Sequence, residues 1–293
     1  MINKKLLLTR SLTGAVYVGL ILACILTDQV VLMAWLLALF AMLGSYEYQV
    51  MTKANVYALF LKIWHALMSG LLVYTSYELA TYTGDFKPVL MAILPYMLYV
   101  LFYLIGEIYR LQRLPAVEVG HAFFSHLYVA IPLGLLLMLT GDRYGIAEVL
   151  GADFAFPRTF WLLPVFVTIW LNDTGAFLVG SLLGRHKLLE RVSPNKTWEG
   201  AIGGAVLAIA GCIGFYYLFP EVTAPAHWMI LGFIIVFFSN YGDLFESFLK
   251  RSYGVKDSGN LLPGHGGILD RIDSLLFVSI PALLYINMVV LQH

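Results

Sequence analysis

Long apolar stretches alternate with short polar segments along the whole chain. Each stretch has close to the ~20 mostly apolar residues that a helix needs to cross a bilayer. The stretches are unbroken, whereas the strands of a membrane barrel alternate apolar and polar residues. The expected fold class is therefore all-α: a polytopic integral membrane protein with about nine transmembrane helices, at residues 12–27, 30–48, 57–77, 88–108, 121–140, 160–183, 200–219, 227–248 and 272–291.

The composition narrows the class of protein further. Of the 293 residues, 60% are apolar and 12% are charged, about half the usual charged share of ~25%. These values exclude a disordered chain, a soluble nucleic-acid-binding protein and a disulfide-stapled secreted domain. Cys24 and Cys212 lie deep in apolar stretches and are interpreted as small buried hydrophobic residues. The N-terminal stretch is interpreted as an uncleaved first span and not as a signal peptide.

The basic residues are distributed unevenly across the predicted membrane. With the N-terminus in the cytoplasm, fifteen of the eighteen Lys and Arg residues fall on the cytoplasmic side, as the positive-inside rule requires. An odd number of spans then leaves the C-terminus outside. We expect one integral domain over 1–293, with N-terminal spans in 1–160 and catalytic spans in 161–293, in a plasma (inner) membrane. The cytoplasmic loops 184–199 and 249–271 are basic and rich in Gly and Pro, so the active site is expected to face the cytoplasm.

Ionisable side chains inside membrane spans are costly and are functional candidates for that reason. The sixth span contains Asp173, and the eighth contains Asp243, Glu246 and Ser247. Spacings of three and four residues place these three residues of the eighth span and the following Lys250 on one helix face. They predict a functional site that reaches from the membrane to its basic edge. A structural polar seam or an Asp–Lys pair is the alternative.

The loop before the seventh span has the features of an anion site. Ser193 or Thr197 is expected to cap the helix, with Glu199 in its first turn and Lys196 beside its N-terminus. An exposed helix N-terminus with a nearby cation binds phosphates readily. An ordinary helix start beside topology-determining charges explains the same residues equally well.

The last cytoplasmic loop is the densest polar segment. Its basic residues can bind several phosphates; they are Lys250, Arg251, Lys256 and Arg271. Gly266 and Gly267 allow backbone N–H groups to approach an anion. Asp270 and Asp273 follow at the start of the last helix, and carboxylates beside phosphate-binding cations indicate a magnesium site. Contact with anionic lipid headgroups explains the basic residues but not the interleaved aspartates.

These motifs resemble the phosphatidate cytidylyltransferase family (CDP-diacylglycerol synthases). The resemblance runs from Ser247 through His265-Gly266-Gly267 to Asp273, supported by 172–175 and 193–200. It implies that the cytidylyl group of CTP is transferred to phosphatidic acid from the inner leaflet, giving CDP-diacylglycerol and pyrophosphate. It also implies Mg2+ with a monovalent cation such as K+ as cofactors, and a homodimer.

The resemblance and the residues together suggest roles for the candidates. The metal ligands are expected to be Asp243 and Asp270, with Asp173 assisting. The catalytic residues are expected to be Lys250, Arg251, His265 and Arg271, and His265 is assigned to phosphate contact or to leaving-group assistance. The substrate-binding residues are expected to be Ser193, Lys196, Thr197, Glu199, Lys256, Gly266 and Gly267.

Two other functions fit parts of the pattern. A CTP-dependent polyprenol or lipid kinase would transfer the γ-phosphate and release CDP, but the full motif from His265 to Asp273 argues against it. A transporter for an anionic solute would need polar access from both sides of the membrane, whereas the charges here gather on one side. No nucleic-acid partner is expected.

Overall fold

The computed structural model describes residues 4–53, 59–81, 84, 86–110, 115–140, 157–262 and 266–290. The chain forms two compact units. The first comprises Met1–Gly141 and Val255–Ile272, and the second comprises Asp142–Gly254 and Asp273–His293. The prediction of a single integral domain stays a prediction.

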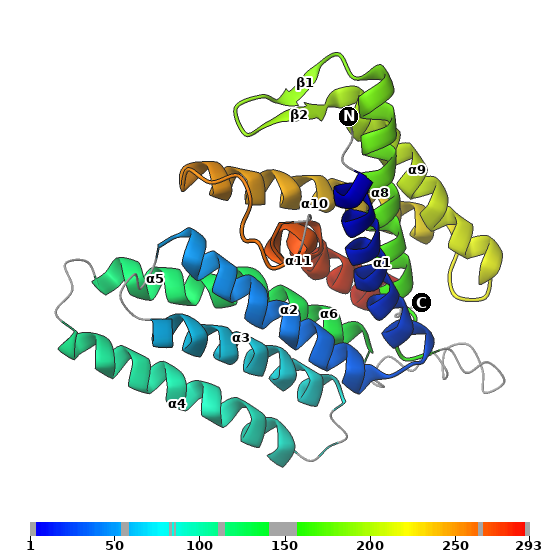
Figure 1. The fold of residues 1–293 in the computed structure, drawn as a ribbon. Coiled ribbons are helices and arrows are strands. Elements are labelled where there is room, and N and C mark those ends of the chain that lie inside the picture. The colour runs from blue at the N-terminus through cyan, green and yellow to red at the C-terminus, as the bar shows by residue number, and fades with distance from the viewer. Residues whose placement is uncertain are drawn as a thin grey trace. The chain divides into compact units, whose positions relative to one another are not determined.

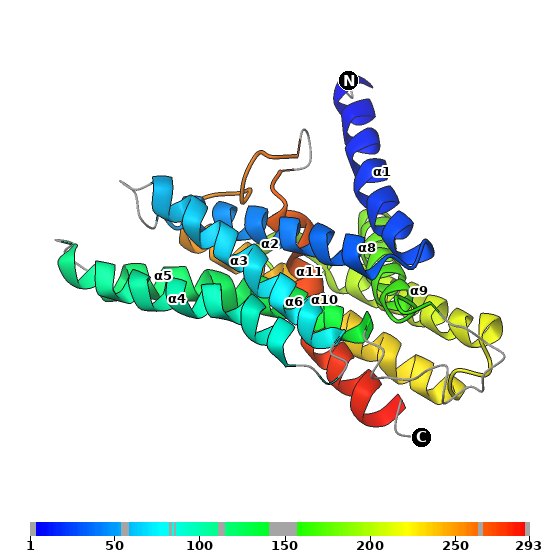
Figure 2. The ribbon, with the colours of Figure 1, turned by 90° about the horizontal axis from the view of Figure 1, so that it is seen from below.

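The first unit is a set of packed helices. They are α1 (Lys4–Leu26), α2 (Val30–Met51), α3 (Leu59–Ala80), α4 (Lys87–Tyr109), α5 (Pro115–Ser125), the π-helical turn η1 (His126–Ala130), α6 (Ile131–Leu137) and the 3-10 turn η2 (Met138–Thr140). Helices α2, α3 and α4 run side by side in both ribbon views (Figures 1 and 2). Helix α1 contacts α2 through stacked rings of Tyr17 and Phe40, whose centroids are 5.6 Å apart.

The second unit contains α8 (Leu162–Leu183), a hairpin of β1 (Lys187–Leu189) and β2 (Ser193–Thr197), α9 (Trp198–Leu218) and α10 (Pro225–Ser252). Helix α11 (Leu269–Tyr285) begins in the first unit and continues in the second, where η4 (Ile286–Val290) follows it. Helices α8 and α9 pack closely because Gly175 and Gly204 meet between them: a Cβ atom at Gly175 would lie 2.9 Å from the Cα atom of Gly204. Small residues permit such close approach of membrane helices.

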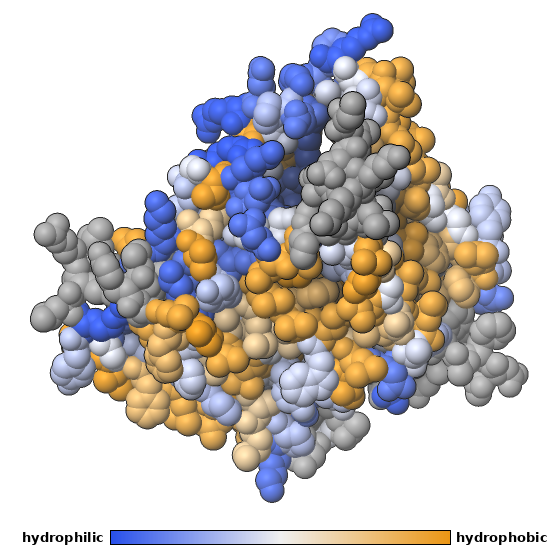
Figure 3. Space-filling view, viewed as in Figure 1, coloured by the Kyte–Doolittle hydropathy of each residue, from blue (hydrophilic) through white to orange (hydrophobic). Residues whose placement is uncertain are grey.

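The surface of the helices is largely apolar. Leu94, Leu101 and Phe102 of α4 are exposed, and so are Ile202 and Val206 of α9. Figure 3 shows orange, apolar side chains over the helices and blue, hydrophilic ones gathered over the β1–β2 hairpin. Apolar side chains that point outward are what a lipid environment selects.

Each predicted span overlaps a helix or a run of successive helical segments, and residues 57, 58 and 291 at the span ends lie outside the described residues. Seven helices there are long and apolar enough to cross a membrane: Val30–Met51, Leu59–Ala80, Lys87–Tyr109, Ala116–Thr140, Leu162–Leu183, Trp198–Leu218 and Pro225–Ser252. The chain is thus a mostly helical membrane protein. The count of nine spans and the orientation stay predictions, and the antiparallel hairpin within 184–199 is a local departure from an all-helical chain.

Candidate active site

The predicted polar stripe lies on one face of α10. The Ser247 hydroxyl donates to Asp243 Oδ1 at 3.4 Å, and the Lys250 ammonium donates to the carboxylate of Glu246 one turn away. Glu246 and Lys250 are both buried. The shared face that the three- and four-residue spacings predict is confirmed. Lys250 reaches inward to Glu246, and its predicted contact with substrate phosphate stays a prediction.

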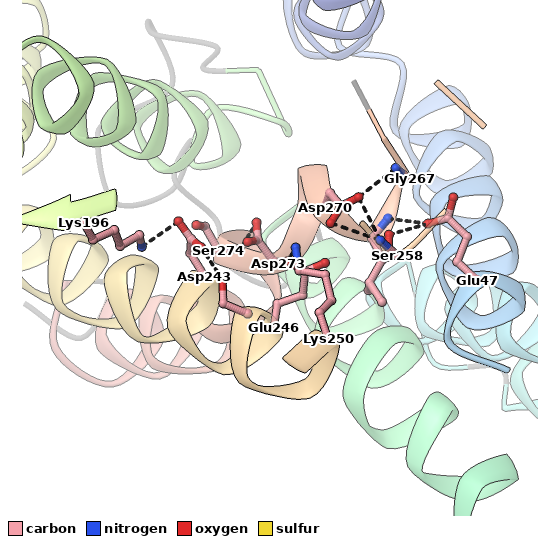
Figure 4. A network of polar contacts seen from close by, with 12 residues as sticks. Glu47, Lys196, Asp243, Glu246, Lys250, Ser258, Gly267, Asp270, Asp273 and Ser274 are labelled. Atoms are coloured by element: carbon pink, nitrogen blue, oxygen red, sulfur yellow. Dashed lines mark hydrogen bonds and ion pairs between the residues drawn. The ribbon is translucent and has the colours of Figure 1, made fainter. Parts of the chain in front are cut away.

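An ion pair joins this stripe to the hairpin. Lys196 Nζ, on strand β2, lies 2.6 Å from Asp243 Oδ2 on α10 (Figure 4), and the two side chains are 25% and 36% exposed. Partial exposure leaves both charges within reach of a phosphate or a cation from outside. Two motifs that are far apart in the sequence therefore form one charged site in the second unit.

The site contains a further carboxylate, that of Asp273. Asp273 of α11 is buried, and the charges of Asp243, Asp173 and Lys250 act on it. Gly242 makes this approach of α10 and α11 possible, since a Cβ atom there would lie 2.6 Å from the backbone oxygen of Asp273. The site thus concentrates three aspartates around two lysines.

The donor chemistry of this site fits magnesium. Within the residues that the structure describes, no three His, Cys, Asp or Glu side chains are arranged to hold a metal ion together. Magnesium, however, takes one or two protein carboxylates and completes its shell with phosphates and water. Asp243 can take this role because its carboxylate is partly exposed, and Asp173 is exposed as well. The metal roles of Asp243, Asp270 and Asp173 stay predictions.

The start of α9 has an N-terminal cap, and its first turn also binds the hairpin that precedes it. Thr197 is the N-cap and accepts from the Gly200 N–H at 3.2 Å, as the sequence predicts. Glu199 accepts from the backbone N–H groups of Arg185 and His186 at 3.1 and 3.2 Å and pairs with the His186 ring. Glu199 therefore holds the hairpin that carries Ser193 and Lys196, and its predicted substrate contact stays a prediction.

In the first unit, the last loop folds around Asp270. The Asp270 Oδ2 atom accepts from the backbone N–H groups of Gly267 at 2.8 Å and Ser258 at 3.1 Å. Gly266 adopts a φ of +84°, a backbone conformation that favours glycine. Lys256 and Arg271 are exposed in this unit, and Arg251 is exposed in the other. His265 lies outside the described residues.

Glu47 is a residue of this loop environment that the sequence analysis missed. It lies on α2, is buried, and accepts hydrogen bonds from Ser258, Ile268 and Leu269. The signal that identifies it is the one that identified Asp243: an ionisable side chain within a membrane span.

The fold and these clusters define a class: a polytopic membrane protein with carboxylates and lysines grouped on its helices and on the β1–β2 hairpin. The cytidylyltransferase family model matches residues 8–289, so the chain belongs to the cytidylyltransferase family. The phosphatidate cytidylyltransferase of Staphylococcus aureus (strain COL) is 48% identical over 120 residues, 40% of this chain and 45% of the relative. That of Brucella suis biovar 1 (strain 1330) is 49% identical over 174 residues, 59% of this chain and 56% of the relative. The chain thus spans about half the length of these curated relatives.

Proposed function

We propose that the protein transfers the cytidylyl group of CTP to phosphatidic acid, producing CDP-diacylglycerol and pyrophosphate for phospholipid synthesis. Family membership over most of the chain supports the reaction type, and the names of the relatives support the lipid acceptor. The observation that carries the proposal is the partly exposed Lys196–Asp243 ion pair. The pair brings together a cation that can bind phosphate and a carboxylate that can hold Mg2+, the two kinds of group that nucleotidyl transfer needs.

In this reaction a phosphate oxygen of phosphatidic acid attacks the α-phosphorus of CTP. The bond from that phosphorus to the bridging oxygen breaks, and pyrophosphate leaves with the electron pair. The attacking oxygen is already anionic, so the chief barrier is the meeting of two polyanions. Positioning and charge neutralisation are the effective means of catalysis in such transfers.

The chain's own residues supply this neutralisation. The Lys196 ammonium exchanges its bond to Asp243 for a bond to phosphate, and the exposed Arg251 guanidinium binds phosphate bidentately. Lys256 and Arg271 of the first unit are exposed cations of the same kind. Asp243 would hold Mg2+, which when bound neutralises phosphate charge and polarises the phosphoryl group that is attacked.

The proposal also covers the orientation, the membrane, the cations and the oligomeric state of the protein. The N-terminus lies in the cytoplasm, and the protein occupies the plasma (inner) membrane with its active site facing the cytoplasm. CTP arrives from that side and phosphatidic acid from the inner leaflet. A monovalent cation accompanies magnesium, and the protein acts as a homodimer. The support is the excess of basic residues in the predicted cytoplasmic loops and the resemblance of the motifs.

A detergent assay of the purified protein tests the reaction. Phosphatidic acid, Mg2+ and CTP labelled in the cytosine are combined, and both lipid-extractable label and pyrophosphate are measured. We expect the two products in equal amounts and neither when EDTA is added. Release of CDP and a phosphorylated lipid in a parallel tube with polyprenol would instead identify a CTP-dependent kinase. Folded protein without turnover in either tube would contradict the proposal and lead to transport assays.

A further inference from the structure

Glu47 ties the last loop to helix α2. Its Oε1 atom accepts from the Ile268 N–H at 3.0 Å, and its Oε2 atom accepts from the Leu269 N–H at 2.9 Å and the Ser258 hydroxyl at 3.1 Å. Figure 4 shows the carboxylate pointing from α2 into the loop. The donors lie more than two hundred residues along the chain, and the Glu47 residue is only 3% exposed.

The Glu47 carboxylate accepts hydrogen bonds from N–H groups at the start of α11, so each supplies the hydrogen-bond partners that the other needs. Helix α11 begins at Leu269, and the first N–H groups of a helix have no partners within it. An acidic group at that end also interacts favourably with the helix dipole. A buried carboxylate in turn is costly unless it accepts hydrogen bonds, and Glu47 accepts three. Glu47 is therefore an N-terminal cap supplied by another helix.

Two glycines make room for this cap. A Cβ atom at Gly259 would lie 2.5 Å from Glu47 Oε1, and one at Gly267 would lie 2.7 Å from Glu47 Cδ. Real Cβ atoms essentially never come so close, and the three hydrogen bonds prevent the carboxylate from moving aside. The loop backbone thus wraps closely around Glu47.

The same contacts hold Asp270. Ser258 donates its hydroxyl to Glu47 and its backbone N–H to Asp270, at 3.1 Å in both cases. Gly267, whose backbone faces Glu47, also donates its N–H to Asp270. Loss of the Glu47 contacts therefore frees both donors that orient the Asp270 carboxylate.

We propose that Glu47 is a positioning residue for catalysis. It fixes the described loop residues 255–262 and 266–268 and the first turn of α11 in the conformation that presents Asp270 and Arg271 to the substrates. This inference rests on the proposed cytidylyl transfer. Glu47 touches no substrate; it acts through the segment that it holds.

The test is the substitution Glu47→Gln, which keeps the size of the side chain but replaces one acceptor oxygen with an NH2 donor. The matched control is Glu107→Gln, because Glu107 is also buried in this unit and pairs with Arg110, not with the loop. Hydrogen–deuterium exchange is measured by mass spectrometry on both variants. Steady-state kinetics with CTP and phosphatidic acid follow.

For Glu47→Gln we expect the amides of Ile268 and Leu269 to exchange at least about tenfold faster, since exchange reports local opening. Peptides from α10 should exchange as in the unaltered protein. We also expect kcat to fall at least about tenfold, with a smaller change in the KM for CTP. The control should change neither the exchange of the loop nor kcat. Ser258→Ala, which removes one of the three hydrogen bonds, should give the same changes to a smaller degree.

Unchanged loop exchange in Glu47→Gln would overturn the inference, and so would faster exchange with unaltered kcat. If Glu47→Gln does not fold, Ser258→Ala decides by the same two measurements. Failure of the proposed function is recognised separately, because the unaltered protein would then make no CDP-diacylglycerol. The exchange experiment reports on the Glu47 contacts in either case.

Discussion

The buried pair of Glu246 and Lys250 allows a prediction about stability. The substitution Lys250→Met keeps most of the length of the unbranched side chain and removes the ammonium group, leaving a carboxylate that is 1% exposed without that charge beside it. Removing one partner of a buried ion pair costs about 3–5 kcal/mol, whereas an exposed i,i+4 pair is worth only ~0.3–0.5 kcal/mol. Burial of both side chains favours the larger value. With about 2–4 °C per kcal/mol, the thermal midpoint should fall on the order of 10 °C.

The double variant Glu246→Leu/Lys250→Met isolates the cause. Replacement of a buried ion pair by apolar residues of similar volume is often neutral, so the double variant should recover most of the lost stability. The thermal midpoints of the unaltered protein and of both variants are measured by tryptophan fluorescence, in the same detergent and at the same heating rate. A loss near 0.5 kcal/mol for the single variant, or no recovery in the double variant, would refute the reasoning. Turnover separates the two roles of Lys250: a phosphate contact predicts an inactive double variant, and a structural role predicts an active one.

Three further predictions concern the charged clusters and the helix contact. Asp243→Ala and Asp270→Ala should each lower kcat more than about 100-fold while the protein stays extractable and folded; near-normal rates for either would contradict its metal role. Lys196→Ala should lower kcat/KM about 10- to 100-fold, the value of a hydrogen bond to a charged group, with little change in thermal midpoint; unaltered efficiency would leave this loop as an ordinary helix start. Gly204→Ala should destabilise the protein by about 1–3 kcal/mol, because its Cβ atom would lie 2.5 Å from a backbone oxygen of α8. Gly214→Ala on the same helix, where a Cβ atom meets nothing within 4 Å, is the control.

Local features of the fold were predictable from the sequence. Runs of apolar residues located the helices, the spacing in α10 located its polar face, and Thr197 was a recognisable N-cap. These features depend on residues within one or two helical turns of each other. Periodicity and capping preferences describe interactions of this range.

The hairpin in 184–199 was not predictable in the same way. Strand β1 has only three residues, and no alternation of apolar and polar side chains marks it. The hairpin is also held by Glu199, which accepts hydrogen bonds from the backbone N–H groups of Arg185 and His186 from the first turn of α9. The contact that builds the charged site, from Lys196 to Asp243, is also tertiary. Neither the hydrophobic pattern nor secondary-structure propensity identifies a partner residue that is distant in the sequence.

The acidic residues of the spans nevertheless show where distant partners are needed. Glu107 and Glu246 each have a basic residue three or four positions along the helix, and each pairs with it. Glu47 and Asp243 have no basic residue at those positions. Both have partners far away in the chain: the N–H groups at the start of α11 for Glu47, and Lys196 for Asp243. A carboxylate in a span must be compensated. When the helix itself supplies no cation, the compensation comes from another segment, and in this chain those segments are the loops that carry the candidate chemistry.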